Sequence, residues 1–337
     1  MNSPPSRASA RAPLARTLLL ALAGGSALIA CQTPEGRGSA TETTGAEPAG
    51  AEQLPENPAA GPVPYDPRVW DKGAPDSIGV FLAGLDKSMR AWTNLTLTAQ
   101  TQTDRNKARR LQEVLMREVH ARQQELVDEL ESGPPRNRAI AAGALGFSAS
   151  KDVQGPLLVG LGDKDSAVVQ NSALSLALLE NPETPMEPLL EVMRANLNGK
   201  ARANAAYAVR TILEAGAPSS PDVVKAARSA LFDQEPFAQA QAALIVAVTG
   251  AGECIPDLAE ALGGREPLVV NAATQALVAL GRHDVKLLGP CGRALVTGLG
   301  TAPEELQPVL QRALVMLSGQ NFGEDEKAWS EWAQRLP

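Results

Sequence analysis

The chain is poor in the side chains that catalysis and metal binding use most often. Of its 337 residues, only two are histidine and three are cysteine. An enzyme needs titratable or nucleophilic groups that converge in a pocket, and no histidine here has a partner at metal-ligand spacing. The GxSxG, P-loop and HExxH patterns are also missing. We therefore expect a non-catalytic protein with no metal, no cofactor and no small-molecule substrate.

Aromatic residues are scarce as well, at 3% of the chain, although hydrophobic residues make up 44%. The core must therefore be aliphatic and rich in alanine, a composition that suits closely packed helices. The net charge of −7 gives no support to nucleic-acid binding. We expect an all-α protein whose partners are not nucleic acids.

The longest apolar run lies at the N-terminus, where Arg7, Arg11 and Arg16 precede the uncharged residues 17–30. A membrane-spanning helix needs ~20 apolar residues, and this run is shorter. A basic segment followed by a short apolar stretch and small residues is typical of a secretory signal peptide. The sequence therefore predicts that residues 1–30 direct export.

The run closes with Leu28, Ile29, Ala30 and Cys31, which resembles the lipobox of bacterial lipoproteins. The resemblance implies that Cys31 receives a diacylglycerol and becomes the first residue after cleavage. Several acyl chains make such a membrane anchor stable where one does not. The alternative is an ordinary signal peptide with a chance cysteine. Because Gln32 stands where an inner-membrane retention signal has Asp, we expect the outer membrane, facing the periplasm, rather than the inner membrane.

Two further regions precede the main body of the chain. Residues 31–67 are rich in Gly, Ala, Pro, Thr and Glu, and this composition predicts a disordered tether behind the lipidated cysteine. Residues 68–133 predict a helical pair, because apolar residues recur there at spacings of three and four. The second helix of this pair is expected to run to about Glu131 and to stop at Gly133 and Pro134.

From residue 134 onward the chain repeats itself. Prolines open short aliphatic segments at intervals of 32, 33, 35 and 34 residues, and an alanine-rich amphipathic run precedes each of them. These prolines are Pro156, Pro188, Pro221, Pro256 and Pro290. Proline suits the first position of a helix, and a period in the low thirties is typical of stacked helical hairpins.

The segments at 131–147 (ESGPPRNRAIAAGALGF) and 163–179 (DKDSAVVQNSALSLALL) resemble HEAT-type repeats of the short bacterial kind. The resemblance covers roughly residues 134–337 and implies an α-solenoid, but it is hardly specific for function. Near the end of the chain, Phe322, Trp329 and Trp332 resemble a C-terminal motif of bacterial HEAT-repeat proteins. We expect these residues to cap the open end of the stack, and the alternative is a paired-tryptophan ligand site.

Cys254 and Cys291 are the other two cysteines, and they lie near the start of the proline-led helices of adjacent units. A disulfide needs Cα atoms within about 7 Å, whereas neighbouring helices pack 8–10 Å apart. Two separate buried thiols are therefore favoured, and a bridge at the helix ends stays open.

Three functions are consistent with these features. The leading hypothesis is a membrane-anchored scaffold or adaptor that presents a curved solenoid to protein partners that the sequence does not identify. The second is a permanent structural subunit of an envelope assembly for secretion, motility or surface maintenance. The third and most remote is a HEAT-like enzyme such as a lyase, for which the sequence contains no supporting motif.

Overall fold

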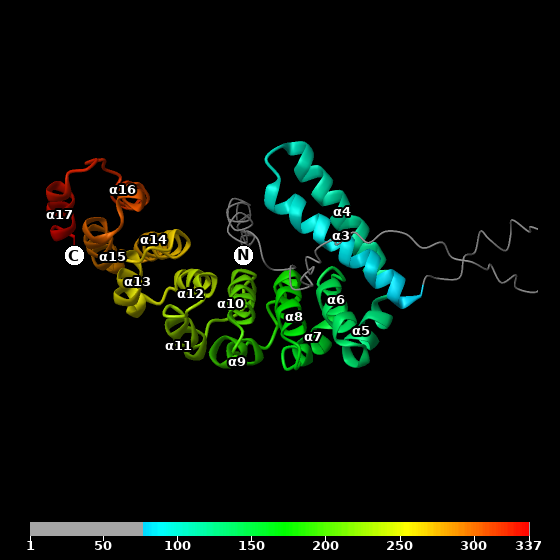
Figure 1. Cartoon of the computed structure of the whole chain (residues 1–337). Coiled ribbons are helices and arrows are strands. Elements are labelled where there is room, and N and C mark those ends of the chain that lie inside the picture. The colour runs from blue at the N-terminus through cyan, green and yellow to red at the C-terminus, as the bar shows by residue number, and fades with distance from the viewer. Residues whose placement is uncertain (1–76, 337) are drawn as a thin grey trace, which may run out of the picture.

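The computed structural model describes residues 77–336, and every regular element in that range is helical (Figure 1). The predicted all-α fold of stacked helices is confirmed. The predicted signal peptide, the lipobox at 28–30, Cys31 and the tether lie outside the described residues. Among the residues that the structure describes, no helix is long and apolar enough to cross a membrane.

The solenoid has two layers of helices that follow an arc (Figure 1). The inner layer lines the concave side and consists of α6 (Pro135–Leu145), α8 (Ser166–Leu179), α10 (Gly199–Glu214), α12 (Pro236–Thr249), α14 (Pro267–His283) and α16 (Gln307–Ser318). The outer layer consists of α5 (Gln123–Ser132), α7 (Gln154–Gly160), α9 (Glu187–Ala195), α11 (Pro221–Ala230), α13 (Ile255–Leu262), α15 (Val285–Thr301) and α17 (Glu326–Gln334). From α5 to α16, each outer helix packs on the inner helix that follows it in sequence, and successive inner helices pack side by side.

Alanine lets the inner helices approach one another closely. Its small side chain fills most of the contact surfaces of α10 and α12, where the alanines are almost all buried. Polar caps fix several helix starts: the Asp165 side chain accepts a hydrogen bond from the Ala167 amide, and Asn198 accepts one from Ala201. The buried apolar side chains form one continuous core from Leu82 to Ala333.

The proline rhythm marks helix starts, with one exception. Pro188, Pro221 and Pro256 occupy the first two positions of α9, α11 and α13, and Pro156 is the third residue of α7. The prediction for Pro290 is wrong, because this residue lies inside α15. That helix begins earlier because Asp284 caps it and accepts a hydrogen bond from the Lys286 amide.

Two helices precede the layers: α3 (Ile78–Thr98) and α4 (Gln102–Ala121) form a hairpin, and α3 packs on α6 (Figure 1). The second helix of this pair was predicted to run to about Glu131. That extent is wrong, because the chain leaves helical geometry at Arg122. The guanidinium of Arg122 lies 4.2 Å from the centre of the Phe81 ring, where the α3–α4 hairpin meets the start of α5. Since α5 packs on α6, residue 133 lies between the two helices of one packed hairpin.

Candidate protein-binding surface

The inner helices carry few charges where they line the concave side. Helices α8 and α12 contain no charged residue along their whole length. In α10 the guanidinium of Arg202 is paired and that of Arg210 is buried, and α14 has charges only at Arg282 and His283 in its last turn. The outer helix α9, by contrast, exposes Glu187, Glu191 and Arg194 to solvent. The concave face is therefore uncharged along α8 and α12, and α10 adds the exposed charges of Lys200 and Glu214 near its two ends.

Aliphatic side chains reach solvent on this face. An inner helix has inner neighbours on both sides and an outer helix behind it, so an exposed side chain in its middle faces the concave side. The ninth and thirteenth residues of α8 and α12 and the ninth residue of α10 have this exposure. We call the following set the concave row: Leu174 and Leu178 on α8, Tyr207 on α10, and Leu244 and Val248 on α12. Leu178 and Val248 are the most open, with 39% and 40% of their surface exposed.

A buried arginine supports the centre of the concave row. Arg210 is only 1% exposed, and its guanidinium lies 5.1 Å from the centre of the Tyr207 ring. Its Nε donates to Oε1 of Gln241 at 2.7 Å, and its Nη1 donates to Oε1 of Glu214 at 2.7 Å. Burial raises the pKa of the Tyr207 hydroxyl, which keeps the ring neutral. The one cation beneath the row is thus held in the protein rather than presented on the surface.

Two arginines bind inner helices to the loop that leads into the next inner helix. Arg138 donates from Nε and Nη2 to both oxygens of Asp163, at 2.8 and 2.9 Å, and Arg202 binds Asp233 in the same way at 2.6 Å for both bonds. The third nitrogen of each guanidinium donates to a backbone carbonyl in the loop before the arginine's own helix, Gly133 for Arg138 and Asn196 for Arg202. We call these two pairs the Arg–Asp clamps. They fix the spacing of α6 to α8 and of α10 to α12, and therefore the surface that these helices present.

The clamps hold their aspartates in the ionised form. The hydrogen bonds from Arg138 lower the pKa of Asp163 below its ordinary value, against a smaller desolvation effect. For Asp233, burial alone would raise the pKa, but the bonds from Arg202 and from the Glu235 amide together outweigh it and lower the pKa.

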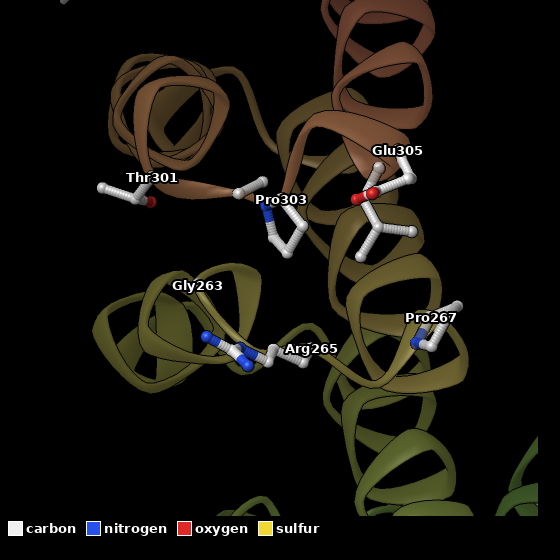
Figure 2. Close-up of a pocket in the computed structure, with 8 residues that line it drawn as sticks. Gly263, Arg265, Pro267, Thr301, Pro303 and Glu305 are labelled. Atoms are coloured by element: carbon white, nitrogen blue, oxygen red, sulfur yellow. The ribbon is translucent and has the colours of Figure 1, made fainter.

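The α8–α10 and α12–α14 junctions lack the clamp. The equivalent positions are Val169 and Asn196 at the first, and Gln239 and Gly264 at the second, and neither combination can form the ion pair. Nearby, a hollow of about 700 Å³ lies between the α13–α14 and α15–α16 connections (Figure 2). Arg265 and Glu305 stand on its walls. The hollow is open and has no buried polar group aimed into it, so we do not treat it as a ligand site.

The structure places the cysteine candidates apart from the concave row. Cys254 and Cys291 are free thiols and fully buried, so the disulfide that the sequence left open is not formed. Burial raises the pKa of each thiol to about 11. Both act as small apolar residues in the core.

The aromatic residues near the C-terminus pack against one another. Trp329 has no exposed surface, and its Nε1 donates to the Gly323 carbonyl at 3.0 Å. Its ring lies 4.8 Å from the Phe322 ring and 5.9 Å from that of Trp332. Trp332 in turn lies against Gly292 of α15, where a Cβ atom would come within 3.1 Å of the indole. The burial of Trp329 leaves no room for a ligand between the two tryptophans.

One family model matches the chain, and its description is HEAT repeats. The match covers residues 124–210, which run from the second residue of α5 through most of α10. Residues 124–210 therefore contain HEAT repeats. A similar packing of helical hairpins continues beyond the matched residues, from α11 to α16.

Three solved structures are distantly similar to this chain. One engineered protein is 22% identical, with a TM-score of 0.45, over 58% of this chain and 98% of its own. A second engineered protein is 20% identical, with a TM-score of 0.42, over 58% and 96%. Human deoxyhypusine hydroxylase in complex with glycerol is 18% identical, with a TM-score of 0.34, over 72% and 98%. No curated protein sequence matches the chain.

Sequence reasoning did not find the concave row or the Arg–Asp clamps. The clamp partners Arg138 and Asp163 are 25 residues apart, so their pairing appears only when the hairpins are stacked. A signal was nevertheless present, because α8 and α12 lack charge on all sides although each must have one solvent face. Within residues 77–336, no group of three or more His, Cys, Asp or Glu residues is placed to hold a metal ion.

Proposed function

We propose that this HEAT-repeat protein is a membrane-anchored lipoprotein of the bacterial cell envelope and a non-catalytic scaffold that binds other proteins. The concave row carries the proposal, because aliphatic side chains exposed on a curved surface with few charges are typical of protein interaction sites. The Arg–Asp clamps support it further, since they hold part of this surface in a fixed shape and reduce the cost of ordering it on binding.

The sequence around Cys31 supports the anchor. In the proposal, lipid on Cys31 holds the chain at a membrane, the outer membrane facing the periplasm in preference to the inner one. A flexible tether of about 35 residues averages roughly 30–35 Å from end to end and stretches to roughly 115 Å. The HEAT repeats would then reach partners well beyond the lipid headgroups.

The test is a crosslinking pull-down from native membranes with the wild-type protein and with Cys31→Ser. We expect the wild type to recover a defined envelope protein and the variant to lose both the membrane fraction and that protein. If Cys31→Ser stays in the membrane fraction, the anchor is wrong. If neither form recovers a specific protein, the scaffold is wrong.

A permanent subunit of an envelope assembly is the second candidate, and one observation favours it. The absence of charge from α8 and α12 resembles the composition of lasting interfaces, which are more apolar than transient ones. Recovery of the partner at fixed stoichiometry, and its persistence through washing at high salt, would favour the permanent subunit over the adaptor.

A further inference from the structure

One position equivalent to the exposed Leu178 and Val248 is covered by another helix of the same chain. Phe147 lies in the turn two residues beyond the end of α6 and thirteen residues after the residue that precedes α6, the same separation as Leu178 and Val248 have for α8 and α12. Phe147 is only 5% exposed, because the Trp92 ring of α3 lies 5.0 Å away and perpendicular to it. Leu178 and Val248 are 39% and 40% exposed. The same position is therefore covered by α3 after α6 and open on α8 and α12, whereas on α10 it holds Thr211, which is buried.

The element that covers Phe147 is an amphipathic helix. In α3 the residues Leu82, Leu85 and Met89 are buried at spacings of three and four, and Trp92 continues the stripe. Helix α3 packs on α6 but leaves Leu178 of the next inner helix open (Figure 1). The open part of the concave row thus continues an interface in which a helix already lies on the inner layer.

The charge of the surface restricts what can lie on it. A charged side chain placed against α8 or α12 would lose its water and find no counter-charge on those helices. The contacting face must therefore be apolar, like the stripe of α3. The row is also spread over three helices on an open face, which suits an elongated element better than a single acyl chain.

We propose that Leu174, Leu178, Tyr207, Leu244 and Val248 bind an amphipathic helix of a partner protein through an uncharged aliphatic stripe. This inference rests on the proposed scaffold function and names the partner class for the same surface. Inner helices that pack 8–10 Å apart place α8 and α12 roughly 16–20 Å from each other. A bound helix that crosses all three therefore needs about 11–13 residues at ~1.5 Å each.

The test places a photo-crosslinking amino acid at Leu178 or at Val248 of the full chain, in cells that make the protein natively. The matched control is Val159 of α7, which is apolar and 76% exposed but belongs to the outer layer. We expect crosslinks from positions 178 and 248 that map to one partner segment with apolar residues spaced by three and four. Position 159 should give none to that segment.

Several outcomes overturn the inference. Crosslinks from positions 178 and 248 to lipid, to residues 1–76 of this chain, or to a second copy of it assign the row to another occupant. Crosslinks to an extended or charged segment exclude an amphipathic helix, and a yield no higher than that of position 159 excludes any occupant.

A second measurement separates this inference from the proposed function. In the pull-down with Cys31 intact, Leu178→Glu and Val248→Glu should each recover at least tenfold less partner, whereas Val159→Glu should recover the wild-type amount. Circular dichroism of the three variants checks that they fold. If the partner is retained by Leu178→Glu and Val248→Glu, the scaffold stands and binding through the concave row is wrong.

Discussion

At the scale of single residues, the clearest contacts are those of the Arg–Asp clamps, and they predict a dependence of stability on pH. The pKa of Asp163 is lowered in the folded protein, and an unfolded Asp titrates near ~3.9. A lowered pKa stabilises the folded state fully above the unfolded value, and the stabilisation is lost as the pH falls through the folded pKa. Between about pH 5 and pH 3, Asp163→Asn should therefore lose less stability than the wild type.

Urea unfolding at pH 6 and pH 3.5 measures this difference in unfolding midpoint. Glu191→Gln serves as the control, because Glu191 is exposed on α9 and has no ion pair among the residues that the structure describes. This variant should follow the wild type at both pH values. An equal drop in the wild type and in Asp163→Asn would show that the Arg138 pair does not contribute.

The two buried thiols give a second prediction at this scale. Because burial raises the pKa of Cys254 and Cys291 to about 11, only ~0.1% of either is thiolate at pH 8. We expect iodoacetamide to modify both at least tenfold more slowly in the folded protein than in urea. Mass spectrometry of the peptides reports the extent, and rapid labelling of the folded chain would contradict the burial of these side chains.

At the scale of elements, α17 depends on one indole. Trp329 is fully buried between Phe322 and Trp332 and has its own hydrogen bond to Gly323. Removing a buried aromatic ring typically costs about 3–5 kcal/mol. Trp329→Ala should lower the free energy of unfolding by that amount and increase hydrogen exchange in α15 and α17. The exposed Glu326→Ala on the same helix should change stability by less than about 0.5 kcal/mol.

The elements were largely predictable because their signals are local. The regular proline spacing and the alanine-rich runs predicted the helices of the repeats, and three of the prolines lie in the first turn as expected. The two wrong predictions, at Arg122 and Pro290, have causes that the spacing of apolar residues and prolines does not show. A helix break at Arg122 depends on the packing of α5 against α6, and the start of α15 depends on the Asp284 cap. Apolar spacing does not reveal either.

The pairing of helices was harder to predict than the helices themselves. The sequence suggests units in which an alanine-rich run precedes a proline-led helix, but from α5 to α13 each outer helix packs mainly on the inner helix that follows it, and α15 packs on both α14 and α16. Sequence order is the same for both arrangements, so periodicity does not distinguish them. The concave row escaped prediction for the same reason, because Leu174 and Leu244 share a surface only when α8, α10 and α12 are stacked.

At the scale of the whole molecule, two junctions between inner helices from α6 to α14 carry a clamp and two do not. Arg138 and Arg202 clamp the α6–α8 and α10–α12 junctions, whereas the equivalent positions hold Val169 and Asn196 at α8–α10 and Gln239 and Gly264 at α12–α14. Repeat proteins gain stability from the contacts between neighbouring units. The unclamped junctions should therefore open at a lower free energy than the clamped ones.

Building the missing clamp tests this view. In the double variant Gln239→Arg with Gly264→Asp, the new side chains stand at the positions of the α12–α14 junction that are equivalent to Arg202 and Asp233. The new Cβ at residue 264 would meet only the Ala261 carbonyl, at 3.2 Å. We expect a favourable coupling of roughly 0.5 kcal/mol between the two substitutions, together with slower hydrogen exchange in α14. The two single variants complete the cycle, since neither forms the pair. A coupling of zero would mean that the helix positions at this junction differ from those at α10 and α12, and that the hollow beside Arg265 reflects a different stacking geometry rather than a missing ion pair.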